Sequence, residues 1–265
     1  MNYENLMTVM RRLALEAGDV IMDIYETNDF SVNVKSDNSP VTAADEAADQ
    51  LISAGLRAAF PNVALVTEEQ SVSHGARADV FLIVDPLDGT KQLIRRRGDF
   101  TVNIAYIEHG VPTRGIVYAP AKGRLFYTLA NGQSVEEIGE FDKNQAAPTQ
   151  PIRVNQADNT ALMVVASKSH RDRQTDAYIE KYAVKDMKSA GSSLKFCLIA
   201  TGEADLYPRL GRTMEWDTAA GHAVLSGAGG KVVRFDDLKP LRYGKGGYEN
   251  PFFIAYGDDV ELKEP

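Results

Sequence analysis

Asp85-Pro86-Leu87-Asp88-Gly89-Thr90 follows directly on Val80–Val84, an apolar run that predicts a central, buried strand. In open layered sheets, ligands gather outside the carboxyl ends of strands. Two aspartates at such a position therefore indicate a binding site, and the backbone N–H groups of Gly89 and Thr90 are suited to a phosphate oxygen. Asp-Pro and Asp-Gly pairs are also common in plain turns, so this stretch does not decide the question alone.

Other acidic residues accompany this stretch. Glu68-Glu69 follows a second predicted strand, Asp217 opens an apolar helical run, and Asp45 lies in the first turn of another predicted helix. Each also has a structural explanation of its own. Glu68-Glu69 can be a solvated pair, Asp217 can be an N-cap, and Asp45 can be part of a capping box over Thr42–Asp45. Their combination with Asp85 and Asp88 favours a shared site.

Oxygen ligands are typical of Mg²⁺, which often uses few carboxylates together with water and substrate phosphate. The histidines His74, His109, His170 and His222 are scattered and show no zinc spacing. The sequence therefore predicts a magnesium site, with two or more ions, in preference to a zinc site.

The hydrophobic periodicity predicts an α+β chain in which helices cover sheets. Helices are expected over 4–26, 44–59, 171–182, 192–201 and 217–227, and strands over 63–67, 80–84, 100–106, 116–118, 125–129, 162–166, 205–207, 231–235 and 252–256. Residues 131–151 are polar and contain two prolines. We expect the boundary between two halves, 1–150 and 151–265, at this stretch.

Composition excludes several classes of protein. The 37 acidic and 29 basic residues leave a formal net charge of −8, which argues against a protein that coats nucleic acid. Cys197 is the single cysteine, so an internal disulfide is excluded and a cytoplasmic location is expected. No apolar run approaches the roughly 20 residues that span a bilayer, so no transmembrane segment is expected.

The acidic motifs resemble the signatures of the inositol monophosphatase superfamily, in order over nearly the whole chain. These motifs are Thr67-Glu68-Glu69, Asp85–Thr90 and Trp216-Asp217-Thr218-Ala219-Ala220. The runs Asp88–Lys91, Phe100–Ile104, Gly191–Phe196 and Tyr207–Leu210 are similar to its bisphosphate nucleotidase branch. Gln92-Leu93 and Arg95-Arg96-Arg97 depart from that branch, and both departures affect the rim of the site rather than a metal ligand.

The resemblance implies a layered α-β-α-β-α sandwich of the sugar and inositol phosphatase type, and it implies roles for individual residues. Glu68, Asp85 and the Leu87 carbonyl would hold one Mg²⁺, and Asp85, Asp88 and Asp217 a second. Thr90 would orient the attacking water, with its hydroxyl polarised by Asp45. The substrate contacts that it implies are Glu68, Asp88, Gly89, Thr90, His170, Ser192, Lys195, Arg209 and Asp217.

Within that set, the resemblance places a 5'-phosphate that is not cleaved near Ser192, Lys195 and Arg209, and the base or ribose near His170. Without the resemblance, Lys195 would be interpreted as a solvated surface lysine. Ser192 and Lys195 are three residues apart at the start of a predicted helix and therefore share a face. His222 and Cys197 are interpreted as structural residues.

The function implied is a phosphatase that converts adenosine 3'(2'),5'-bisphosphate to AMP and phosphate and is inhibited by lithium. An inositol or sugar monophosphatase of the same superfamily is the alternative enzyme, and a nucleotide-binding sensor with a degenerate site is the alternative without catalysis. The partner expected is a small phosphorylated nucleotide. The sequence leaves open the oligomeric state and any peripheral association with the inner membrane.

Overall fold

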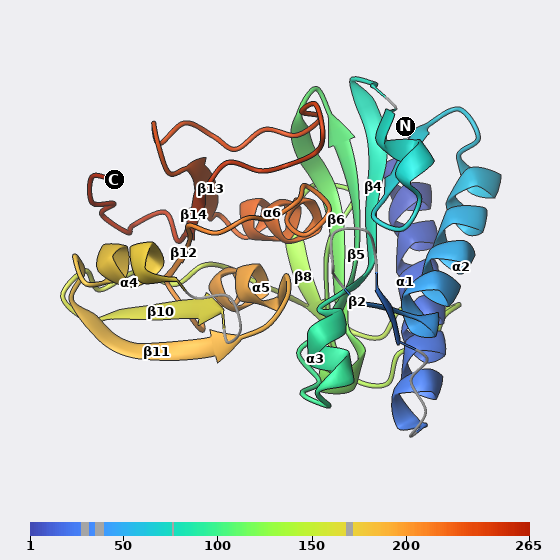
Figure 1. Ribbon diagram of the computed structural model, residues 1–265. Coiled ribbons are helices and arrows are strands. Elements are labelled where there is room, and N and C mark those ends of the chain that lie inside the picture. Colours follow the sequence, from blue (N-terminus) through green and yellow to red (C-terminus); the bar gives the residue numbers. More distant parts are fainter. Residues whose placement is uncertain (28–31, 35–39, 76, 168–171) are drawn as a thin grey trace.

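The computed structural model describes residues 1–27, 32–34, 40–75, 77–167 and 172–265, which form successive layers of helices and sheets (Figure 1). A helix pair is followed by a large sheet, a second helix pair, a smaller sheet and one outer helix. The described α-helices are α1 (Tyr3–Glu26), α2 (Ala43–Ala59), α3 (Thr90–Ile94), α4 (Arg173–Ile179), α5 (Leu194–Ala200) and α6 (Ala219–Gly227), with 3₁₀ turns η1 (Ser71–Gly75) and η2 (Pro120–Lys122). This order confirms the expected α-β-α-β-α sandwich.

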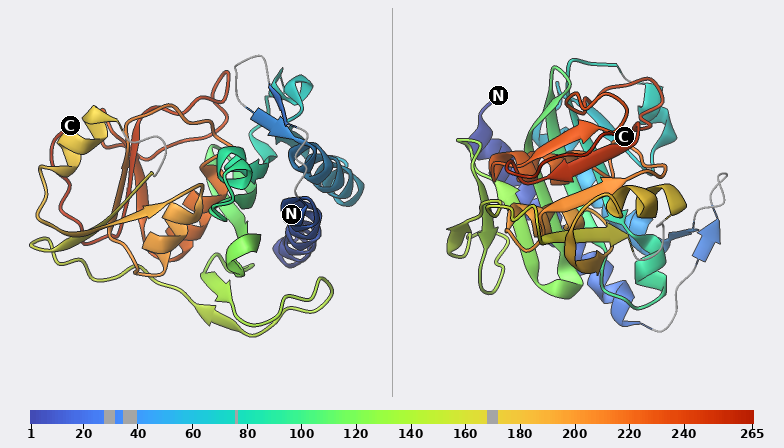
Figure 2. Two further views of the ribbon diagram at one scale, coloured as in Figure 1. Left: turned by 60° about the horizontal axis from the view of Figure 1, so that its bottom comes forward. Right: turned by 90° about the vertical axis from the view of Figure 1, so that its left-hand side faces the viewer.

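The larger sheet lies between the helix pairs α1/α2 and α5/α6 (Figures 1 and 2). Its strands are β3 (Ala64–Thr67), β4 (Val80–Asp88), β5 (Thr101–Glu108), β6 (Val111–Ala119), β7 (Arg124–Thr128), β8 (Ser134–Glu137) and β9 (Thr149–Pro151), neighbours in that order. Strands β3 and β4 are parallel, and every later pair is antiparallel. The predicted meander is therefore confirmed, and it is longer than expected.

Strands β8 and β9 lie inside the polar stretch 131–151. The sequence did not predict them because β8 contains two charged residues, Glu136 and Glu137. In the fold, Arg124 bonds Glu136 at 2.7 Å, and Arg11 from α1 forms a buried ion pair with Glu137. The division into halves at this stretch stays a prediction.

Strand β4 extends beyond the apolar run that predicted it, through the acidic stretch to Asp88. Asp85 pairs with Asn103 and Asp88 with Thr101, so β4 carries one extra residue between these two pairs. Pro86 has no N–H to donate to a ladder and falls within this bulge. The sequence-based interpretation of a turn after the strand was therefore wrong: the two aspartates project from an irregular strand end.

The smaller sheet has the order β11-β10-β12-β14-β13 and packs one face on α5 and the other on α4. Its strands are β10 (Leu162–Ser167), β11 (Val184–Ala190), β12 (Leu206–Arg209), β13 (Lys231–Arg234) and β14 (Phe253–Tyr256). Strand β11 was not predicted, because its lysines and aspartate hide the alternation of an exposed edge strand. A separate hairpin pairs β1 (Val32–Val34) with β2 (Pro40–Thr42).

Three helices are shorter than expected, among them α6, which begins at Ala219 rather than at residue 217. Helix α4 spans Arg173–Ile179, shorter than the expected 171–182, and α5 begins at Leu194 rather than at residue 192. Helices α1 and α2 match their predicted ranges, and the capping box of Thr42 and Asp45 is present. Among the described helices, none combines the length and the apolar character needed to cross a membrane.

Helix α6 packs closely against the large sheet at Gly115 of β6. A Cβ atom at Gly115 would lie 2.6 Å from the carbonyl oxygen of Ala220 and 2.8 Å from the Cβ of Ala223. The small residues on both sides allow the backbones of helix and strand to touch, and this sets the depth at which α6 sits.

We therefore expect Gly115→Ala to destabilise the protein by about 1–3 kcal/mol, because α6 must move away from β6. The control is Gly75→Ala, where the added Cβ meets no atom within 4 Å. Urea unfolding of both variants and the wild type measures the difference. A Gly115→Ala variant as stable as Gly75→Ala would contradict this account of the packing.

Candidate active site

A cleft of about 1010 Å³ opens where the strand ends of the large sheet meet α5, β12 and the turn before α6. The predicted site residues that line it are Glu68, Asp85, Leu87, Asp88, Gly89, Thr90, Ser192, Lys195, Arg209 and Asp217. Asp45 is buried and bonded to Thr90. His170 lies outside the described residues, so its predicted role stays a prediction.

Three acidic side chains converge at one end of the cleft. One carboxylate oxygen each from Glu68, Asp85 and Asp217 lies within 4.8 Å of the others. The parallel pairing of β3 with β4 places Thr67 beside Val84, which brings Glu68 next to Asp85. Asp217 arrives from the turn that precedes α6, over 120 residues further along the chain than Asp85. We call Glu68, Asp85 and Asp217 the acidic cluster.

Asp88 adjoins the acidic cluster but is held separately. Its Oδ2 accepts hydrogen bonds from the backbone N–H of Ser193 at 2.7 Å and from the amide of Asn103 at 3.3 Å. Asn103 was not singled out as a functional residue from the sequence. The signal was present, since the alternation in Phe100–Ile104 places polar Thr101 and Asn103 on the face opposite to Phe100 and Val102.

The electrostatics of this end of the cleft favour a bound cation. Burial, reinforced by the charges of Glu68, Asp88 and Asp217, raises the pKa of Asp85 well above its usual value. Burial also raises the pKa of Asp217, and it raises that of Asp88 to about 6 even though Lys195 opposes the shift. Carboxylates held this close are stabilised by protons or by metal, and metal binding displaces the protons.

The donor set fits a hard cation such as Mg²⁺. All the candidate ligand atoms are oxygens, from the carboxylates and from the carbonyl of Leu87 near Thr90. Among the described residues that line the cleft, the one histidine is His74. Its Nε2 is 2.8 Å from the carbonyl oxygen of Thr67. The part of the chain described here therefore offers no zinc-like set in the cleft.

Asp45 serves two purposes at once. One of its oxygens accepts bonds from the backbone N–H and the hydroxyl of Thr42, which completes the cap of α2. The other accepts a bond of 2.8 Å from the hydroxyl of Thr90. Burial raises the pKa of Asp45, while the hydrogen bonds from both threonines oppose this shift. Both sequence-based interpretations of Asp45, as a cap and as the partner of Thr90, agree with these contacts.

The cleft is also lined by cationic residues. Lys195 is only 5% exposed, so its interpretation as a surface lysine is wrong. Burial lowers the pKa of its ammonium group to about 8, and Asp88 opposes the shift. The Nζ donates to the carbonyl of Ser192 at 2.7 Å, and Arg209 lines the same cleft.

Ser192 lies before the first residue of α5, not within the helix. Its hydroxyl lies 2.8 Å from the carbonyl of Asp88 and 2.6 Å from that of Asp99, so it ties the start of α5 to the end of β4. Its predicted contact with a phosphate stays a prediction.

Comparison with known proteins agrees with this geometry. A sequence model described as the Inositol monophosphatase family matches residues 2–251. The chain belongs to the inositol monophosphatase family. It is 45% identical to the protein named 3'(2'),5'-bisphosphate nucleotidase CysQ of Escherichia coli strain K12, over 88% of this chain and 91% of that protein.

Solved structures give the same assignment. The crystal structure of CysQ from Bacteroides thetaiotaomicron superposes with a TM-score of 0.82 at 36% identity, covering 98% of both chains. The inositol monophosphatase of Thermotoga maritima superposes with a TM-score of 0.77, covering 94% of this chain and 91% of that one. Its 24% identity supports a shared fold.

We expect Asp85→Asn to raise the melting temperature of the metal-free protein, because it removes one of several buried charges that repel each other. The amide oxygen can still accept the 3.1 Å bond from the N–H of Leu87. The measurement is thermal unfolding in EDTA and in Mg²⁺. A gain of about 1 kcal/mol corresponds to roughly 2–4 °C. In Mg²⁺, the variant should lose most of the stabilisation that the wild type gains. A lower melting temperature in EDTA than that of the wild type would contradict the repulsion argument.

Proposed function

We propose that this protein is a Mg²⁺-dependent phosphatase that hydrolyses adenosine 3'(2'),5'-bisphosphate to AMP and phosphate. The observation that carries the proposal is a single cleft lined by the acidic cluster and by the cationic residues Lys195 and Arg209. Such a cleft matches a substrate with two phosphates, one at the reacting centre and one remote from it. Relatives named as 3'(2'),5'-bisphosphate nucleotidases, at 45% and 42% identity, support this choice.

The acidic cluster, Asp88 and the Leu87 carbonyl would hold the cations. When bound there, Mg²⁺ supplies charge that acidifies water and stabilises the departing oxygen. Without such cations, the carboxylates would repel a phosphate group. The aspartates project from a strand end that hydrogen bonds fix, so the ligands are arranged before substrate arrives.

Thr90 and Asp45 would orient the water and accept its proton. Because the hydroxyl hydrogen of Thr90 is donated to Asp45 Oδ1, the lone pairs of Thr90 Oγ1 remain available to a water molecule. As the water oxygen bonds to phosphorus and the ester P–O bond breaks, the proton of the water can pass through Thr90 to Asp45. The raised pKa of Asp45 suits a proton acceptor.

Lys195 and Arg209 would bind the phosphate that is not cleaved. A buried ammonium group in a polar cleft forms a stronger contact with an anion than an exposed one, because water screens it less. Binding energy from this remote phosphate can be used to position the reacting phosphate. An inositol monophosphate has no second phosphate that could bind Lys195 and Arg209.

A phosphate-release assay with a panel of substrates tests the proposed function. In millimolar Mg²⁺ we expect kcat/KM for adenosine 3',5'-bisphosphate to exceed that for inositol monophosphate and for simple sugar phosphates by at least about 10²-fold, the equivalent of roughly 2.7 kcal/mol. A preference for inositol monophosphate would favour the alternative enzyme. Release from no substrate would favour a nucleotide-binding protein without catalysis.

Lys195→Ala should lower kcat/KM for the bisphosphate by about 10- to 150-fold, since a charge-assisted hydrogen bond contributes roughly 1.5–3 kcal/mol. It should have little effect on a small monophosphate. The control is Lys231→Ala, which removes an exposed lysine paired with Asp258. Equal losses on both substrates would show that Lys195 acts through Asp88, not on the remote phosphate.

A further inference from the structure

The residue before Trp216-Asp217 is a glutamate that the proposed chemistry does not use. Glu215 has no exposed surface, yet it carries a carboxylate. Its Oε2 accepts a 2.6 Å bond from the N–H of Gly244, and its Oε1 accepts a 2.9 Å bond from the N–H of Lys245. The ammonium group of Lys245 adds an ion pair at 2.6 Å. Gly244 has a φ of +86°, a backbone conformation that glycine adopts without strain and that lets two successive N–H groups face one carboxylate.

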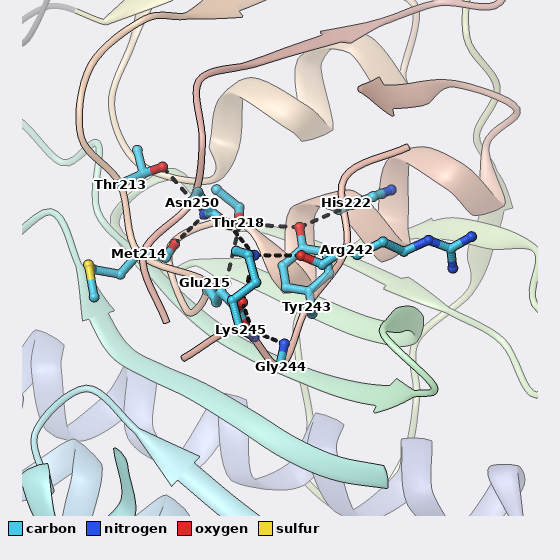
Figure 3. A network of polar contacts seen from close by, with 10 residues as sticks. All are labelled: Thr213, Met214, Glu215, Thr218, His222, Arg242, Tyr243, Gly244, Lys245 and Asn250. Carbon is cyan, nitrogen blue, oxygen red and sulfur yellow. Dashed lines mark hydrogen bonds and ion pairs between the residues drawn. The ribbon is translucent and has the colours of Figure 1, made fainter. Parts of the chain in front are cut away.

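A second set of bonds joins the same two segments. The amide of Asn250 donates to the carbonyl of Met214 at 2.8 Å and to the hydroxyl of Thr218 at 3.0 Å. The hydroxyl of Thr218 also accepts a bond of 3.2 Å from the hydroxyl of Tyr243. The same Tyr243 hydroxyl lies 3.0 Å from Nδ1 of His222 (Figure 3). We call residues 242–250 the C-terminal brace.

The brace acts on the turn that carries Asp217. Backbone bonds at 2.7 Å from the N–H of Glu215 to the carbonyl of Tyr248, and at 2.9 Å from the N–H of Asn250 to the carbonyl of Thr213, hold the N-terminal side of that turn. Within the turn, the N–H of Met214 donates to Asp217 Oδ2 at 2.8 Å. Asn250 therefore holds the same residue, Met214, that orients the carboxylate of Asp217.

We infer that Glu215 and Asn250 are positioning residues for Asp217, and that the C-terminal brace sets the metal affinity of the acidic cluster. Residues that orient metal ligands through hydrogen bonds typically alter metal affinity by about 10- to 100-fold when they are replaced. The inference rests on the proposed role of Asp217 as a metal ligand. The brace contributes no ligand of its own.

The test measures metal binding without substrate or turnover. Mn²⁺ is the probe because it shares the oxygen-ligand preference of Mg²⁺ and its free ion is detected by electron paramagnetic resonance. Trp216, the single tryptophan of the chain, gives a second reading by fluorescence beside Asp217. For Glu215→Gln we expect the apparent Kd for Mn²⁺ to rise at least about tenfold.

Glu137→Gln is the matched control. Glu137 is also a buried glutamate, it accepts a backbone N–H from Ala147 at 2.8 Å and it is paired with Arg11, but it does not line the cleft. We expect this variant to lose thermal stability while its Kd for Mn²⁺ stays within twofold of the wild type. Asn250→Ala removes no buried charge, although it loses the bond of 3.3 Å from the ammonium group of Lys245 together with those to Met214 and Thr218. It is the deciding variant if Glu215→Gln does not fold.

Equal Mn²⁺ affinity in the wild type and in a folded Glu215→Gln or Asn250→Ala variant would overturn the inference. An equal loss in Glu137→Gln would also overturn it, because the effect would then be general destabilisation. Asp217→Asn separates this failure from that of the proposed function. If that variant binds Mn²⁺ as tightly as the wild type, the metal role of Asp217 is wrong and the brace has nothing to position.

Discussion

The repulsion among closely spaced carboxylates, of which Asp85 is buried and the others partly buried, is the constraint on which this structure depends. Glu68, Asp85 and Asp217 share a space in which ligand oxygens lie within 4.8 Å of each other, and burial adds to the cost of their charges. A fold tolerates such a cluster only where rigid elements on several sides oppose its separation. Here the parallel pair β3 and β4 and the turn before α6 provide those elements, at a cost that a divalent cation offsets.

The aspartates of the site are supported in different ways. Asp88 is held by a backbone N–H and by Asn103, whereas Asp45 shares its two oxygens between a helix cap and Thr90. Within the acidic cluster, Asp85 accepts the N–H of Leu87 and Asp217 accepts the N–H of Met214. These four aspartates therefore each have at least one oxygen that is hydrogen-bonded within the fold.

Much of the fold could be predicted from local patterns, because these patterns reflect local physics. The periodicity of α1 and the capping box of Thr42 and Asp45 depend on residues within one or two turns of each other. Strand β8 could not be predicted this way, since Glu137 is neutralised by Arg11, which lies 126 residues away. Without the family resemblance, Lys195 would be interpreted as exposed for the same reason: its burial comes from elements that the local sequence does not reveal.

The candidate site was predictable from its motifs, whereas its supports were not. Asp85 and Asp88 are recognised by their spacing, but Glu215 is one more polar residue in the sequence until the loop between β13 and β14 is seen beside it. The acidic cluster includes residues 68 and 217, and the brace ends at residue 250. A ribosome must therefore make the chain through residue 217 for the acidic cluster, and through residue 250 for the brace, before the cation site can assemble. A bound cation can therefore stabilise the fold only late in synthesis, and a shorter nascent chain gains no stability from it.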